Sequence, residues 1–127
     1  MPMYVVEKVQ NALNDHSKPI KGSHIHILGV AYKKDIDDVR ESPALDIIRL
    51  LERRGADITY SDPHVPQIRF EGLELRSDMA GLAEADCIVI VTDHTGFDYK
   101  GLVEKASLIV DTRNALKGVK SDKIVRL

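Results

Sequence analysis

Segments rich in apolar residues alternate along this chain with segments of helical periodicity. Residues 25–31, 56–61, 87–92 and 108–111 form short runs with few polar interruptions, as expected for buried parallel strands. Residues 42–54 and 98–105, which lie between these runs, repeat their apolar positions at helical spacing. The alternation predicts an α/β fold: a Rossmann-like three-layer sandwich with a mostly parallel sheet and helices on both of its faces.

Four further segments complete the prediction. They are a helix at 2–14, an edge strand at 73–75, a short helix at 78–84 and an edge strand at 124–127. Ser42 and Pro43 fit the N-cap and the first position of the helix at 42–54. Pro63, Pro66 and Gly72 predict a loop.

Composition and charge restrict the classes of protein to consider. The length of 127 residues suits one domain with a proper core, and a net charge of −2 gives no global attraction to nucleic acid or to an anionic membrane. No apolar run approaches the length of a membrane span, and no signal-peptide pattern opens the chain. We expect a cytoplasmic protein in which any anion site is local.

The cysteine and histidine positions favour neither metal binding nor thiol chemistry. Cys87 is the single cysteine and lies in an apolar run, where it is expected to behave as a small hydrophobic residue. His24 and His26 share one face of a predicted strand, but a third ligand is missing. We therefore predict no metal site.

The loop at 29–43 is the strongest candidate for a binding site. It follows a predicted strand, opens a predicted helix, and holds Lys33, Lys34 and Arg40 among four acidic residues. Ligands of open α/β sheets bind at such a place, and cations beside a helix N-terminus suit a phosphate group. The loop keeps only the first glycine of the dinucleotide fingerprint, so side chains would have to recognise the phosphate. The alternative is a solvated loop whose charges pair with one another.

Three other strand ends carry candidate polar residues, each with a simpler alternative. Arg113 follows a strand and points to the same edge of the sheet, although the spacing alone favours the simpler interpretation, a pair with Asp111 that closes a turn. Asp93 and His94 suit an acid–base pair, but a turn with a helix N-cap is the commoner arrangement. Asp62 occupies the position that reads a ribose in dinucleotide-binding folds, and here we expect it to shape the following turn.

The order of residues at 29–44 resembles the signature of the C-terminal, UDP-binding domain of UDP-glucose/GDP-mannose dehydrogenases. Further matches follow in the expected order at 60–63, 91–94 and 111–114. Residues 1–6 resemble the end of the family's central helical region, especially in members that act on UDP-N-acetylhexosamines. The resemblance implies a remnant of the central dimerisation helix and linker at 1–17 and a UDP-sugar-binding domain at 18–127.

The resemblance also implies a reaction and a set of site residues. The family oxidises the C6 alcohol of a nucleotide sugar to a carboxylate, in two NAD-dependent steps, for polysaccharide precursors. Tyr32 and Lys33 match the pair that contacts the nucleotide sugar, and Arg113 matches a strand-end arginine that also reaches it. Arg40 matches an arginine directed toward the pyrophosphate of NAD.

Two departures from the family limit what this chain is expected to do. The sequence contains neither the glycine-rich NAD domain nor the glycine-flanked catalytic cysteine, and Cys87 does not match that cysteine. We therefore expect no catalytic residue here, NAD bound mainly by an N-terminal domain of a parent enzyme, and the parent's other domains as partners in a homodimer or higher oligomer.

The identity of the sugar and one alternative function stay open. UDP-glucose, UDP-N-acetylglucosamine and UDP-N-acetylmannosamine all fit, and residues 1–6 favour an N-acetylhexosamine. The alternative is a stand-alone Rossmann-like module that binds a nucleotide or a protein partner.

Overall fold

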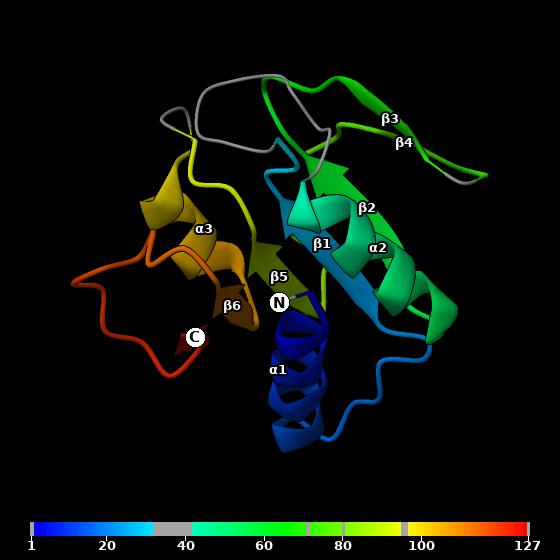
Figure 1. Ribbon diagram of the computed structural model, residues 1–127. Helices are drawn as coiled ribbons and strands as arrows, with labels where there is room; N and C mark the ends of the chain where they lie inside the picture. Colours follow the sequence, from blue (N-terminus) through cyan, green and yellow to red (C-terminus); the bar gives the residue numbers. More distant parts are fainter. Residues whose placement is uncertain (1, 32–41, 71, 80, 95–96, 127) are drawn as a thin grey trace.

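A five-stranded parallel sheet forms the centre of the computed structural model, which describes residues 2–31, 42–70, 72–79, 81–94 and 97–126 (Figure 1). The strand order is β2-β1-β5-β6-β7, and all four neighbouring pairs are parallel. The strands are β1 (His24–Leu28), β2 (Asp57–Ser61), β5 (Cys87–Ile90), β6 (Ile109–Asp111) and β7 (Ile124–Arg126). The chain runs outward from β1 to β2 and then returns to β5 on the other side, so the strand order reverses between β1 and β5. Such a switch point is the usual ligand site in open α/β sheets.

Helices cover both faces of the sheet, which confirms the predicted three-layer sandwich. α1 (Pro2–Asp15) and α2 (Pro43–Arg53) lie on one face, and α3 (Tyr99–Lys105) lies on the other (Figure 1). Ile27 faces the core under α1 and α2, whereas its neighbour Leu28 packs in the cluster that contains Leu102 of α3. Successive strand residues point to opposite faces, so one apolar strand supplies both cores. No helix in the described part of the chain is long and apolar enough to cross a membrane.

The first helix belongs to the same core as the sheet. Its buried face consists of Val5, Val6, Val9, Ala12 and Leu13. These residues pack in one cluster with the strands and with α2, while Met3 and Tyr4 are each 45% exposed. The predicted division of the chain at residue 17 stays a prediction, and α1 packs as an integral layer.

The helix predicted at 78–84 is wrong. The described residues of that segment form turns, with one bond from the Leu82 N–H to the Met79 carbonyl. Gly81 packs so closely against β2 that an added Cβ would lie 2.9 Å from Oγ1 of Thr59. A seven-residue helix gains too few hydrogen bonds to offset its nucleation, so tertiary contact decides the conformation.

The segment after β2 forms a small hairpin outside the main sheet. β3 (Gln67–Phe70) and β4 (Leu73–Arg76) pair antiparallel, with Phe70 opposite Leu73. The predicted strand at 73–75 is therefore confirmed as a strand, but it belongs to this hairpin. The strand β3 was missed because the prolines before it favour a loop, although Ile68 and Phe70 alternate with polar residues as an edge strand requires.

Polar side chains line part of the sheet face on the α3 side. Thr59 Oγ1 lies 2.7 Å from His24 Nε2 and 2.6 Å from His26 Nδ1, and Ser61 Oγ lies 2.8 Å from His26 Nε2. His26 is fully buried. Burial, helped by the nearby charge of His24, lowers the pKa of His26 from 6.5 to about 4. Its hydrogen bonds thus serve a neutral ring.

Acid should destabilise the fold through His26. Between pH 6.5 and 4 the unfolded chain takes up a proton at this residue and the folded chain does not, so the free energy of unfolding falls as the pH falls. The shift corresponds to about 2–3 kcal/mol by pH 4. Urea unfolding from pH 7 to 4 should show the gap between wild type and His26→Gln closing by about that amount. His16→Gln, at an exposed position, should run parallel to wild type. A constant gap for His26→Gln contradicts the prediction.

Gly29 lets β1 leave the sheet close to β5. Its φ is +84°, and an added Cβ would lie 2.4 Å from the carbonyl oxygen of Thr92. Gly29→Ala should therefore lower the free energy of unfolding by about 3 kcal/mol or more, the sum of a left-handed backbone and a clash with main chain. Gly22→Ala is the matched control, because its φ is also +84° and nothing lies within 4 Å of the added Cβ.

The control should cost only about 1 kcal/mol, measured by chemical denaturation of both variants. Equal losses for the two variants would show that the approach of Thr92 is easily relieved.

Candidate functional site

The carboxyl ends of four neighbouring strands meet at one edge of the sheet. Residues 29–31 follow β1, Asp62 follows β2, residues 91–94 follow β5, and residues 112–113 follow β6. Because these strands are parallel and adjacent, their exits lie side by side (Figure 1). All the candidate polar residues named above that the structure describes at strand ends therefore share one edge.

A buried carboxylate joins three of these strand ends. Asp62 is 2% exposed. Its Oδ2 accepts the backbone N–H of Val30 at 2.8 Å and of Ala31 at 3.1 Å, together with Nε2–H of His94 at 2.8 Å. Its Oδ1 accepts the backbone N–H of His64 at 2.8 Å. Four donors thus offset the cost of burying the charge.

These bonds decide between the two interpretations of Asp62. The bond from the His64 N–H confirms that Asp62 shapes the turn after β2. Both oxygens are occupied, so the carboxylate is not available to bind a ribose hydroxyl. The hydrogen bonds between Asp62 and the end of β1 could not be predicted from the sequence, because the donors there are the main-chain N–H groups of Val30 and Ala31.

The residues after β5 have separate partners. Oγ1 of Thr92 donates to the carbonyl of Ala31 at 2.6 Å, and the hydroxyl of Tyr99 donates to Asp93 Oδ1 at 2.6 Å. Burial and the bond to Asp93 raise the pKa of Tyr99. Asp93 therefore bonds a tyrosine while His94 bonds Asp62, and the carboxylate of Asp98 caps α3. The arrangement is structural and differs from an acid–base pair.

Arg113 is exposed at the end of β6 and lies across the end of β5. Its Nε donates to the carbonyl of Val91 at 2.8 Å. Asp111 accepts the backbone N–H groups of Arg113, Ala115 and Leu116 at 2.9–3.1 Å, so it closes the turn through main chain. The predicted Asp–Arg turn is present, but the carboxylate does not take the guanidinium. The terminal nitrogens of Arg113 carry the donors suited to a ligand.

An apolar pocket lies beside Arg113. Its volume is about 190 Å³, and it is lined by Pro2, Val5, Pro43, Ile47, Val91, Thr112 and Arg113. The lining comes from the first turns of α1 and α2 and from the ends of β5 and β6. The guanidinium therefore lies at a hollow that forms only when both helices are docked on the sheet.

Tyr32, Lys33 and Arg40 lie outside the described residues, so their assigned roles stay predictions. The structure describes the two residues that flank this segment. Ala31 is 1% exposed, and Ser42 is 2% exposed with its hydroxyl accepting the N–H of Ala44. The segment that carries the three side chains therefore begins and ends at the same edge as Arg113.

Cys87 behaves as the small buried hydrophobic residue that the sequence predicted. Cys87 is fully buried in β5, and burial raises the pKa of its thiol to about 12, so it does not form a reactive thiolate at neutral pH. Within the described residues, no three His, Cys, Asp or Glu side chains come together as a metal site.

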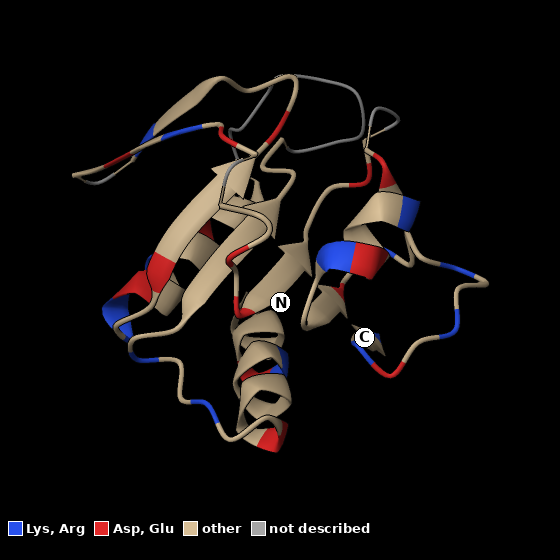
Figure 2. Ribbon diagram, turned by 180° about the vertical axis from the view of Figure 1, so that it is seen from behind, with Lys and Arg blue, Asp and Glu red and all other residues tan. Residues whose placement is uncertain are grey.

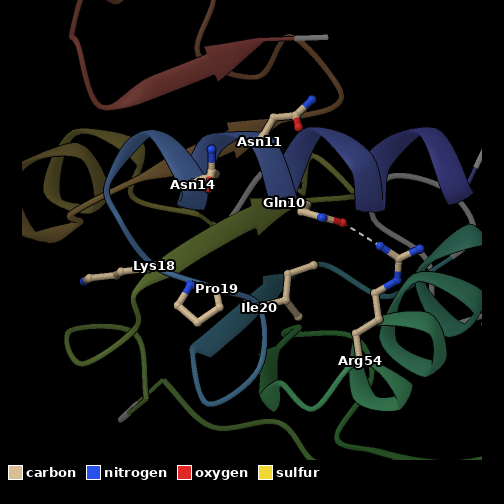
Figure 3. Close-up of a pocket in the computed structure, with 7 residues that line it drawn as sticks. All are labelled: Gln10, Asn11, Asn14, Lys18, Pro19, Ile20 and Arg54. Carbon is tan, nitrogen blue, oxygen red and sulfur yellow. Dashed lines mark hydrogen bonds between the residues drawn. The ribbon is translucent and has the colours of Figure 1, made fainter.

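A larger pocket lies at the opposite end of the sheet, near the starts of β1 and β2. It holds about 600 Å³ and is lined by residues of α1, the linker after it and Arg54 (Figure 3). Arg54 donates to Gln10 Oε1 at 2.6 Å, and Lys18 pairs with Asp86 at 2.9 Å. These cations hold α1 and the linker on the domain, and the pocket is remote from the strand exits.

At the strand exits, two acidic side chains are buried and a basic one is exposed. Figure 2 shows acidic and basic positions interspersed along the helices and the hairpin. At the strand exits, the buried carboxylates of Asp62 and Asp111 accept main-chain N–H groups, while the side chain of Arg113 is exposed. The hydrogen bonds offset these two negative charges locally, so Arg113 is the exposed charge among the three side chains.

Comparison with known proteins identifies the family of the chain. The family model described as UDP-glucose/GDP-mannose dehydrogenase family, UDP binding domain, matches residues 26–118. The chain is 33% identical over 125 residues to a UDP-N-acetyl-D-mannosamine dehydrogenase of Methanococcus maripaludis, covering 92% of this chain and 28% of the relative. It is 38% identical over 104 residues to a UDP-glucose 6-dehydrogenase of Rhizobium meliloti, covering 75% and 24%.

Solved structures show the same relationship. A UDP-D-ManNAc dehydrogenase from Pyrococcus horikoshii superposes with a TM-score of 0.80 at 25% identity, covering 98% of this chain and 30% of the other. The chain thus spans less than a third of the length of these relatives. The matched segment contains the strand exits described above, and the chain belongs to the UDP-glucose/GDP-mannose dehydrogenase family, where it corresponds to the UDP-binding domain.

Proposed function

We propose that this chain binds the nucleotide of a UDP-sugar and serves an NAD-dependent UDP-sugar 6-dehydrogenase as its substrate-binding domain. The observation that carries the proposal is the exposed guanidinium of Arg113, which the bond to Val91 holds across the strand exits. A fixed arginine binds a pyrophosphate well, because its planar donors match phosphate oxygens and less freedom is lost on binding.

The segment at 32–41 supplies the remaining contacts in this proposal. Tyr32 and Lys33 contact the nucleotide sugar from the β1 side, and Arg113 contacts it from the β6 side. Between the two lies the end of β5, whose carbonyl of Val91 already positions the guanidinium. The pyrophosphate would then be held by positive charges from both sides of the switch point, each bond contributing about 1.5–3 kcal/mol.

NAD is held mainly by another domain in this proposal. The described edge does not suit a dinucleotide as its principal ligand, since Asp62 is fully occupied and residue 31 is alanine where the fingerprint has glycine. Arg40 contributes a contact to the pyrophosphate of NAD. The cofactor supplies the oxidant for the C6 alcohol, and this chain's residues anchor the distant nucleotide so that the sugar is oriented.

The names of the relatives support an N-acetylhexosamine as the sugar. Two of the relatives described above act on UDP-N-acetyl-D-mannosamine by their names, and a third acts on UDP-glucose. UDP-N-acetylmannosamine and UDP-N-acetylglucosamine are the sugars that we favour. The parent's N-terminal and central domains, and its dimeric or higher assembly, belong to the same proposal.

Removing one phosphate contact should weaken UDP binding selectively. In a titration of the ¹⁵N-labelled chain with UDP, Arg113→Ala and Lys33→Ala should each raise the Kd about tenfold, the effect of one charge-assisted bond. Lys117→Ala is the matched control, because it removes an exposed positive charge from the turn after Arg113 and should change the Kd less than about twofold.

Uridine, which lacks the pyrophosphate, should bind more weakly than UDP and lose little affinity in either variant. Absence of amide shifts at high millimolar UDP, or equal losses for Lys117→Ala and Arg113→Ala, contradicts the proposed function.

A further inference from the structure

We propose that Asp62 is a positioning residue for nucleotide binding: it holds the main chain at Val30 and Ala31, the last described residues before the segment that carries Tyr32 and Lys33, and binding of the nucleotide depends on that hold. This inference rests on the proposed function of those two residues. Asp62 itself contacts no ligand in the proposal, because its oxygens are already taken by protein donors.

Both polar groups of the last described residue before the segment are held. The N–H of Ala31 donates to Asp62 Oδ2, and its carbonyl accepts from Thr92 Oγ1. That carbonyl belongs to the peptide bond that joins Ala31 to Tyr32, and a peptide bond is planar. Fixing the carbonyl therefore fixes the orientation of the last described peptide group before the segment.

The exit of β1 is held from both sides. Asp62 reaches it from β2, and Thr92 reaches it from β5. Gly29, one residue upstream of Val30, donates its N–H to the carbonyl of Ser61 at 2.9 Å and passes too close to Thr92 for a side chain. Three consecutive residues after β1 are thus bonded to residues at or just after the ends of the neighbouring strands β2 and β5. These bonds are additional to the pairing of the strands themselves.

Asp62 is itself held in place. His94 Nε2 donates to Oδ2, and the ring of His94 packs against His64 with centroids 4.7 Å apart. The backbone N–H of Asp62 donates to Ser77 Oγ at 2.8 Å. Because both the backbone and the side chain of Asp62 are bonded, the carboxylate has little conformational freedom and holds its partners in fixed positions.

Asp62→Asn tests the role with little change in volume. The amide keeps one acceptor oxygen but cannot satisfy all four donors, so the Val30–Ala31 main chain should loosen. In a titration of the ¹⁵N-labelled variant with UDP, the Kd should be about fivefold or more above that of wild type, because small displacements of a binding group commonly weaken binding by that much. Amide hydrogen exchange at Val30 and Ala31 should also speed up.

The matched control is Asp86→Asn. Asp86 is also a carboxylate that accepts a backbone N–H of β1, from His24 at 2.8 Å, but at the opposite end of the strand. Its substitution should change the Kd for UDP less than about twofold. A merely structural role for Asp62 predicts a lower melting temperature for Asp62→Asn and an unchanged Kd, which would overturn the inference.

The outcomes separate this inference from the proposed function. If the wild-type chain shows no UDP shifts, the proposed function fails and the positioning role fails with it. If wild type binds UDP and Asp62→Asn binds equally well, only the positioning role fails. If Asp62→Asn does not fold, Thr92→Val removes the other anchor at nearly constant volume. It should weaken UDP binding in the same direction, and an unchanged Kd would overturn the inference.

Discussion

One buried carboxylate, that of Asp62, organises the edge of the sheet at which its parallel strands end. Burying the charge of Asp62 is unfavourable unless donors surround it, and the donors come from the exits of β1 and β5 and from its own turn. The three strand ends must therefore converge wherever this carboxylate is buried. The parallel sheet places the ends of the strands near one another, and the carboxylate fixes the positions of the residues that follow them.

At this edge, the acidic and the basic side chains have different surroundings. Asp62 and Asp111 face inward and bind main-chain N–H groups, so their negative charge is used to shape turns. Arg113 is exposed and is held by a carbonyl instead of a carboxylate. An ion pair with Asp111 would have neutralised the guanidinium. In the described part of the chain the guanidinium is bonded by a carbonyl and keeps its positive charge, which the proposed contact with a pyrophosphate would use.

The elements predicted correctly are those with a strong local signal. The apolar runs of β1, β5 and β6 and the Ser42–Pro43 start of α2 are visible without tertiary information. The segment at 78–84 was predicted wrongly because packing of Gly81 against Thr59 outweighs a weak helical pattern. The place of Arg113 at the end of a strand was predicted from the sequence, and its role in binding stays a prediction. The hydrogen bonds from Val30 and Ala31 to Asp62 were not predicted, because their donors are backbone N–H groups, which give no signal in the sequence. The roles of Tyr32, Lys33 and Arg40 came from the resemblance and stay predictions.

The hydrogen bonds that hold the end of β1 are made to its backbone, so they place few demands on the identity of the residues there. Asp62 and Thr92 bind the N–H and carbonyl groups at positions 30 and 31, which nearly every amino acid possesses. Substitutions there are limited by the space available to buried side chains, and proline alone is excluded by the bonding itself, because it lacks the N–H. Under the proposed function, a change of the residues that follow, to suit another nucleotide sugar, would leave these main-chain bonds in place.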